Sequence, residues 1–199
     1  MRIGIFSGTF DPIHSGHLSF VKSAKQLLNL DKVLILIEKD PRRKKSVSDY
    51  NHRLNMVKLA LKNEPNFIIE DLDMQKAGKT HTLKETMEEL YKEFGTKTEF
   101  VLLMGGDLFE YIESWEDLDE YLGKLSFGVG LRTEDDGELC IELASRIGAK
   151  IKLIQSPQPS TSSAKIKQKI IAGDTSSELP KEVSEYIKEN SLYEQQTIN

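Results

Sequence analysis

Short apolar runs alternate along the chain with longer segments in which apolar residues recur every three or four positions. The runs predict strands at residues 2–7, 32–37, 67–70, 100–104, 126–131 and 150–154. The periodic segments predict helices between them, at residues 18–30, 50–61, 83–94, 116–122 and 138–146. Thr82 followed by Glu85 forms a capping-box pattern, which predicts the start of the helix at residues 83–94.

Two of the predicted strand segments, at residues 33–37 and 100–104, are apolar throughout rather than alternating. Strands of this kind are covered on both faces, which favours a parallel sheet in an α/β fold. We therefore expect a Rossmann-like parallel sheet flanked by helices. Prolines and serines at residues 157–163 then break the pattern before short predicted helices at residues 164–172 and 180–190. We expect one domain over residues 1–193, with a small helical C-terminal appendage at about residues 160–193 and a frayed tail at residues 194–199.

Composition and charge narrow the class of protein. The 199 residues carry a net charge of −5, which argues against non-specific binding to nucleic acid or to a membrane surface. Cys140 is the single cysteine, so neither an internal disulfide nor a cysteine-rich metal site is possible. The sequence has no long apolar segment and no signal-peptide pattern, and we expect a cytoplasmic protein. Its oligomeric state stays open.

The residues from Gly8 to His17 read GTFDPIHSGH and join the first predicted strand to the first predicted helix. A glycine-bearing turn before a helix gathers unpaired backbone N–H groups and the positive end of the helix dipole, which attract phosphate. His14 and His17 lie at the same junction, so their rings can share the phosphate with the backbone. The alternatives are that the pair caps the helix, or binds zinc with a third ligand from elsewhere in the chain. We expect no protein-built metal site.

Two later segments add candidate nucleotide contacts. Ser162 and Ser163 at a predicted helix start, with Lys167 one turn further on, suit the β- and γ-phosphates of a nucleotide. The alternative is a plain serine cap with solvated lysines. Gly105 and Asp107 follow an apolar strand, where a carboxylate can accept hydrogen bonds from ribose hydroxyls, or where the chain simply turns.

The motif ending in histidine–serine–glycine–histidine resembles the signature of the nucleotidyltransferase superfamily. Within it, the chain is similar over nearly its full length to bacterial nicotinate-nucleotide adenylyltransferases, in register at segments that include residues 52–56, 80–83, 105–108, 162–167, 179–180, 186–187 and 192–193. The resemblance implies transfer of AMP from ATP to nicotinate mononucleotide, giving deamido-NAD and pyrophosphate without a covalent enzyme intermediate. It also implies Mg²⁺, arriving as its complex with ATP.

The resemblance assigns roles to particular residues. It implies that His14, His17 and Lys167 are catalytic. It places ATP against a set of residues in three segments, namely Gly8, Thr9, Phe10, His14, His17, Gly105, Asp107, Ser162, Ser163 and Lys167. It places the acceptor mononucleotide against His81, Thr82, Trp115 and Arg132, with Lys44 or Arg53 as a candidate for its phosphate.

The chain also departs from the usual family pattern. Ala164 stands where the family usually has threonine, Lys167 where it has arginine, and His81 where it has tyrosine. A proline–proline–histidine element on the acceptor side is missing. Two alternatives therefore stay open: adenylyl transfer to another acceptor (nicotinamide mononucleotide or phosphopantetheine), or a catalytically weakened nucleotide-binding protein.

Overall fold

A parallel sheet forms the centre of the molecule. The computed structural model describes residues 1–39, 41, 46–70, 82–131, 135–155, 161–174 and 177–194. Within these ranges the sheet has six strands in the order β3-β2-β1-β4-β5-β6, and every pairing is parallel. The strands span Arg2–Gly8 (β1), Lys32–Ile37 (β2), Phe67–Glu70 (β3), Glu99–Gly105 (β4), Ser126–Leu131 (β5) and Lys150–Gln155 (β6). The fold class expected from the sequence is confirmed.

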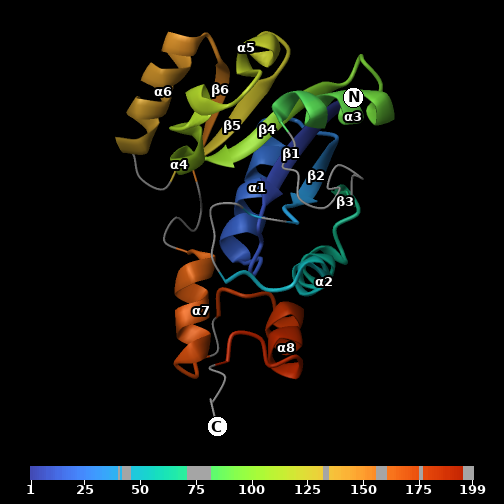
Figure 1. Ribbon diagram of the computed structural model, residues 1–199, viewed down its shortest axis with the longest axis vertical. Coiled ribbons are helices and arrows are strands. Elements are labelled where there is room, and N and C mark those ends of the chain that lie inside the picture. The colour runs from blue at the N-terminus through green and yellow to red at the C-terminus, as the bar shows by residue number, and fades with distance from the viewer. Residues whose placement is uncertain are drawn as a thin grey trace.

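Helices cover both faces of this sheet (Figure 1). They span Ser15–Leu27 (α1), Tyr50–Leu61 (α2), Leu83–Phe94 (α3), Gly106–Phe109 (α4), Leu118–Tyr121 (α5), Asp135–Ile147 (α6), Ser163–Ile171 (α7) and Lys181–Glu189 (α8), with a 3₁₀ turn at Ile112–Ser114. The predicted helices 50–61 and 83–94 have the observed bounds. The others differ at their ends, and the prediction at 116–122 shortens to one turn because Asp117 adopts a left-handed conformation with φ of 62°.

Two apolar clusters lie on opposite faces of the sheet. Val33, Ile35 and Ile37 of β2 pack with α1, α2, α7 and α8, whereas Leu34 and Leu36 pack with α3 and α6. Strand β4 divides its side chains between the clusters in the same way. Side chains of successive strand residues point to opposite faces, so an apolar run without alternation is buried on both sides.

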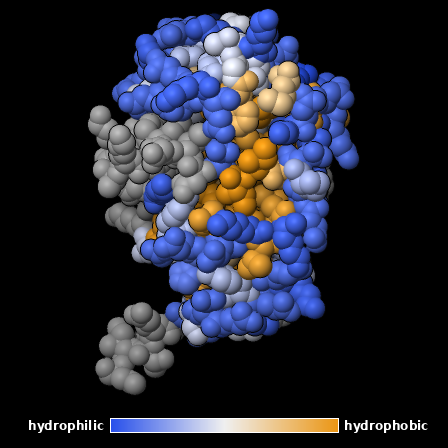
Figure 2. Space-filling view, turned by 90° about the vertical axis from the view of Figure 1, so that its right-hand side faces the viewer, coloured by the Kyte–Doolittle hydropathy of each residue, from blue (hydrophilic) through white to orange (hydrophobic). Residues whose placement is uncertain are grey.

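The edge strand β3 lies on the side of the molecule that faces the viewer in Figure 2. That view shows a central band of apolar residues with hydrophilic regions above and below it (Figure 2). Ile68 and Ile69 of β3 are half-buried.

In the described part of the chain, no helix has the length and apolar character needed to cross a membrane.

The chain reverses its direction across the sheet between β1 and β4. From β1 it continues to β2 and β3 on one side, and from β4 to β5 and β6 on the other. Open α/β sheets bind ligands at the carboxyl ends of their strands beside such a reversal. Helices α7 and α8 lie near this edge, with α8 beside α2 (Figure 1). The backbone N–H of Ser15 donates to the carbonyl of Glu178 at 2.8 Å, which ties the start of α1 to the segment between α7 and α8.

Candidate active site

The turn after β1 brings the two histidines together at the start of α1. His14 is the N-cap residue, with φ of −146° and ψ of 171°, and His17 lies in the first turn. The backbone N–H of His17 donates to Nδ1 of His14 at 3.4 Å, and that of His14 donates to Nδ1 of His17 at 3.3 Å. The rings stack with their centroids 3.7 Å apart. The pair therefore forms a capping box, as the alternative interpretation of the motif expected.

This cap also prepares the imidazoles to donate. In a neutral histidine one ring nitrogen carries the proton and the other accepts, so an Nδ1 that accepts from the backbone assigns the proton to Nε2. Each ring can then offer Nε2–H to an anion while Nδ1 keeps its structural bond. The capping and phosphate-binding interpretations of the motif are thus compatible.

Two aromatic rings pack against His17. The ring of Phe10 meets that of His17 edge-on, with centroids 5.3 Å apart, and the ring of Phe6 lies 6.0 Å from it. Phe10 is buried in a left-handed conformation with φ of 50°. A Cβ on Gly8 would come within 3.0 Å of the Phe10 ring, so glycine makes room for it. Phe10 is placed to orient His17.

Gly16 permits a close approach between the two helix starts. A Cβ at this position would lie 3.0 Å from Nδ1 of His14 and 3.3 Å from Cβ of Thr161, the second residue before α7. Only glycine leaves this space without displacing a neighbour. The glycine of the motif therefore lets α1 and α7 begin side by side.

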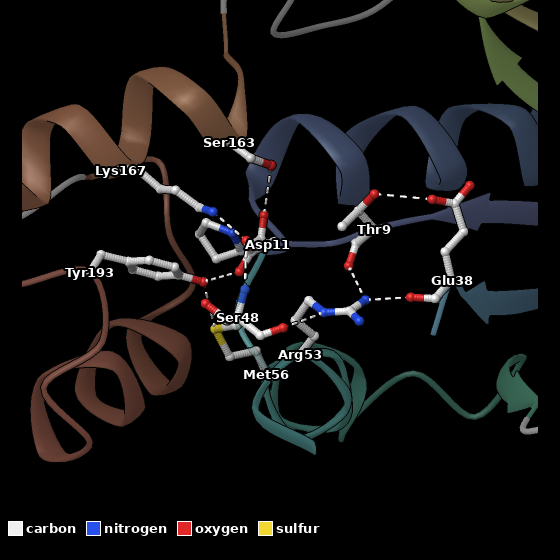
Figure 3. Close-up of polar contacts among 10 residues, drawn as sticks. Thr9, Asp11, Glu38, Ser48, Arg53, Met56, Ser163, Lys167 and Tyr193 are labelled. Atoms are coloured by element: carbon white, nitrogen blue, oxygen red, sulfur yellow. Dashed lines mark hydrogen bonds and ion pairs between the residues drawn. The ribbon is translucent and has the colours of Figure 1, made fainter. Parts of the chain in front are cut away.

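The start of α7 faces the same turn (Figure 3). Ser162 is its N-cap and accepts from the backbone N–H of Lys165 at 3.4 Å. The hydroxyl of Ser163 donates to the carbonyl of Pro12 at 3.0 Å. One turn further on, Nζ of Lys167 is paired with the carboxylate of Asp11. The structure thus brings the second predicted phosphate element against the first.

Gly105 and Asp107 lie where β4 passes directly into α4. Gly105 is the N-cap of this short helix, and no side chain caps it. A Cβ on Gly105 would lie 2.5 Å from Oδ1 of Asp107, so the exposed carboxylate folds back over the strand end. Where the alternative interpretation had a simple turn after the strand, the structure has the start of a helix that the apolar pattern did not predict.

The structure describes only some of the residues that were predicted to contact the acceptor. Thr82 caps α3, accepting from the backbone N–H of Glu85 at 3.2 Å, while its own N–H donates to the Glu85 carboxylate at 3.0 Å. The capping box expected there is confirmed. Trp115 is half-buried and packs against the cluster on the α3 and α6 face. Lys44, His81 and Arg132 lie outside the described residues.

Metal ligands do not gather in the described ranges. Within them, no group of three or more histidine, cysteine, aspartate or glutamate residues could hold a metal ion. His52, one potential partner for the histidine pair, instead places Nδ1 2.9 Å from the hydroxyl of Tyr186.

Known proteins are similar to this chain in sequence. The cytidylyltransferase-like family model matches residues 5–169. A relative from Dehalococcoides mccartyi, named "Probable nicotinate-nucleotide adenylyltransferase", is 31% identical over 203 residues, which cover 98% of each chain. Another of the same name from Thermoanaerobacter sp. is also 31% identical, covering 100% of this chain and 97% of its own length. The chain belongs to the nicotinate-nucleotide adenylyltransferase family. The resemblance seen in the motifs is confirmed.

Solved structures of similar proteins have the same fold. The nicotinic acid mononucleotide adenylyltransferase of Plasmodium falciparum, complexed with NaAD, superposes with a TM-score of 0.78 at 20% identity, over 96% of this chain and 97% of that one. The same enzyme complexed with APC gives a TM-score of 0.76 at 19% identity, over 96% of each chain. At these identities the likeness establishes the architecture of the adenylyltransferase fold for this chain.

Sequence reasoning missed the central role of Asp11 in this family member. Its side chain is 2% exposed and is paired with Lys167. It also accepts from the hydroxyl of Tyr193 at 2.7 Å and from the backbone N–H of Ser48 at 3.2 Å. Burial alone would raise the pKa of Asp11, but the hydrogen bonds and charge of its partners outweigh burial and hold that pKa below its ordinary value. The Asp11 carboxylate is therefore buried and ionised, and it forms a junction with the partners just named.

Arg53 holds the backbone around this junction. The sequence made it a candidate for the acceptor phosphate, but its side chain is 1% exposed and faces inward. It donates to the carbonyls of Thr9 at 2.9 Å and Glu38 at 2.6 Å, and also to those of Ser48 and Lys39. Its guanidinium thus joins the loops after β1 and β2 to the start of α2, and it acts as a structural clamp.

Proposed function

We propose that the protein transfers AMP from ATP to nicotinate mononucleotide, forming deamido-NAD and releasing pyrophosphate. The observation that carries this proposal is the reciprocal cap between His14 and His17. It directs two imidazole donors to the N-terminus of α1, beside the reversal of the sheet, in a chain similar over its full length to nicotinate-nucleotide adenylyltransferases.

The reaction needs alignment and charge stabilisation more than an activated nucleophile. A phosphate oxygen of the mononucleotide attacks the α-phosphorus of ATP, the bond from that phosphorus to the oxygen bridging to the β-phosphorus breaks, and pyrophosphate leaves. Charge builds on the α-phosphoryl oxygens and on the leaving group. The Nε2–H groups of His14 and His17 are suited to the α-phosphate, with His17 the principal donor. Lys167 and the start of α7 are suited to the β- and γ-phosphates.

Mg²⁺ enters this scheme as part of the substrate. ATP arrives as its Mg²⁺ complex, in which phosphate oxygens and water supply most of the ligands. The cation neutralises triphosphate charge, while the protein residues orient the α-phosphorus.

The remaining predicted contacts complete the proposal. Asp107 and Gly105 are suited to the ribose and adenosine, and Trp115 to stacking on the pyridine ring. Thr82, with His81, Arg132 and Lys44 from outside the described ranges, completes the acceptor side. We propose a cytoplasmic protein whose partners are ATP and a pyridine mononucleotide, with no nucleic acid or membrane partner.

A pyrophosphate-release assay tests the proposal. Purified protein with ATP, Mg²⁺ and nicotinate mononucleotide should release pyrophosphate, with nicotinamide mononucleotide and phosphopantetheine as parallel acceptors. We expect kcat/KM to favour the acid over the amide by about 10²-fold or more, because a site built for one polar group leaves its own groups unpaired with the other. An equal or reversed preference would overturn the acceptor assignment.

A second candidate is a nucleotide-binding protein with weakened catalysis. Ala164 and Lys167, which depart from the usual pattern, favour it. Lysine keeps the positive charge of arginine but lacks its bidentate fork. Calorimetric binding of ATP without turnover on any of the three acceptors would support this candidate against the enzyme.

A further inference from the structure

The Asp11 carboxylate joins segments that are far apart in the sequence (Figure 3). It lies in the turn between β1 and α1, 156 residues from its partner Lys167 in α7 and 182 residues from Tyr193 in the C-terminal segment. The Tyr193 hydroxyl donates to its Oδ1 at 2.7 Å, and Lys167 pairs with its Oδ2. The C-terminal segment therefore reaches the turn between β1 and α1.

Lys167 is held from two sides. Its Nζ is paired with Asp11 and also lies 4.9 Å from the centre of the Tyr193 ring, within reach of a cation–π interaction. An ammonium has three N–H donors, and the pairing with Asp11 occupies one of them. The Lys167 side chain is 24% exposed, against 2% for Asp11, so part of the lysine side chain is open to solvent while the carboxylate is enclosed.

The start of α7 is fixed beside the histidine pair. Ser163 donates to the carbonyl of Pro12, and Thr161 lies against Gly16. Lysine has a flexible four-carbon stem, and ordering such a side chain on binding weakens affinity unless the protein orders it beforehand. Asp11 and the Tyr193 ring provide that ordering before a ligand arrives.

We propose that Asp11 and Tyr193 are positioning residues that hold the Lys167 ammonium toward the triphosphate of ATP. The C-terminal segment is thereby part of the nucleotide-binding apparatus. This inference rests on the proposed function, because it takes Lys167 as a ligand of ATP. It concerns ATP affinity, however, and is independent of which acceptor the protein uses.

The Tyr193 hydroxyl is suited to this task because it stays protonated. Burial, followed by the negative charge of Asp11, raises the pKa of Tyr193 far above its ordinary value. The hydroxyl therefore donates to the carboxylate throughout the physiological pH range. Tyr193→Phe removes this donor and retains the ring, so it alters the hold on Asp11 with little loss of packing.

Calorimetric titration with a non-hydrolysable ATP analogue and Mg²⁺ tests the proposal without an acceptor. We expect Tyr193→Phe to weaken binding about threefold to tenfold, the range for losing the order of one flexible side chain. Lys167→Met should weaken binding more. In the Lys167→Met background, Tyr193→Phe should have no further effect on affinity, whereas a merely structural tyrosine would lower affinity equally in both backgrounds.

Tyr186→Phe is the matched control. The Tyr186 hydroxyl lies 2.9 Å from Nδ1 of His52 and accepts from Nδ2 of Asn55 at 3.0 Å, between α8 and α2. Its removal should leave analogue affinity unchanged. The proposal is overturned if Tyr193→Phe binds the analogue as the unaltered protein does, if its effect persists without Lys167, or if Lys167→Met binds normally. Failure to release pyrophosphate with any acceptor, while the coupling holds, would refute the proposed enzyme activity and leave this inference standing.

Discussion

Helices α1 and α7 begin side by side, and both present side chains that the sequence assigns to phosphate. At α1 the cap is a pair of histidines that exchange hydrogen bonds with each other's backbone. At α7 the cap is a serine hydroxyl, and the charged group lies one turn further on, paired with Asp11. The two neighbouring helix starts therefore differ in their polar groups: α1 begins with two imidazoles, whereas α7 begins with a serine and carries its lysine one turn further on.

This difference shows how structural and ligand-binding tasks can be divided. At α1 each imidazole is suited to both, with Nδ1 accepting from the backbone and the proton assigned to Nε2. At α7 the tasks fall on separate residues: Ser162 caps the helix, Ser163 attaches it to Pro12, and Lys167 supplies charge. At α1 a substitution that tests one task must therefore keep the function of one ring nitrogen and remove that of the other. At α7 the two tasks can be removed one at a time by substituting different residues.

His17→Asn should have the largest effect on activity. An asparagine amide places an acceptor near the position of Nδ1, so the capping bond can persist, but it offers nothing at the position of Nε2. We expect kcat to fall by about 10²–10³-fold, as when one preorganised donor to a developing charge is removed. The melting temperature should stay close to that of the unaltered protein. Steady-state kinetics and thermal unfolding measure the two effects.

His52→Asn is the control for this substitution. It makes the same chemical change on α2, where the imidazole contacts Tyr186, and kcat should be retained. A His17→Asn protein with normal kcat would show that the second imidazole nitrogen does not act on the α-phosphate. A large loss of stability would show that asparagine fails to replace the cap.

Gly16→Ala tests whether the two helix starts must lie so close together. The added Cβ would press on the His14 ring and on Thr161. Overpacking of this kind costs about 1–3 kcal/mol, partly offset by the better helix propensity of alanine. We expect kcat to fall about tenfold to 10²-fold, because the imidazole is displaced from its productive position. Gly123→Ala, at a position with nothing within 4 Å, should change neither kcat nor stability.

The sequence predicted the sheet well because burial on both faces is visible in local composition. The runs at residues 33–37 and 100–104 have no polar positions to alternate, and the structure divides their side chains between two clusters. Element ends were less predictable. Residues 15–17 lack apolar periodicity, yet they belong to α1 because His14 caps it.

The role of the turn that carries His14 and His17 could be predicted because its polar groups lie within a few consecutive residues. The contacts that hold this turn could not be predicted, because Asp11 binds Tyr193 across 182 residues and Arg53 binds a carbonyl 44 residues before it. Nothing local distinguishes the buried Arg53 from a solvated phosphate ligand. One signal was available: an aspartate between apolar residues of a turn requires polar partners when it is buried.

Ser162→Ala should have the smallest effect and completes the comparison at α7. Loss of the cap should lower the free energy of unfolding by about 1 kcal/mol and the melting temperature by about 2–4 °C. Asp49→Ala, which removes the cap of α2, should cost similar stability and leave affinity for the ATP analogue unchanged.

Ser162→Asp tests whether Ser162 also contacts phosphate in addition to capping α7. Aspartate caps as well as serine and favours the helix dipole, so stability should be retained. Its negative charge opposes the triphosphate, however, and removes the hydroxyl donor. We therefore expect the aspartate variant to bind the ATP analogue more weakly than the alanine variant, although it unfolds at a higher temperature. If affinity instead follows stability across the two variants, Ser162 only caps α7, and phosphate contacts at this helix come from Lys167 and the backbone.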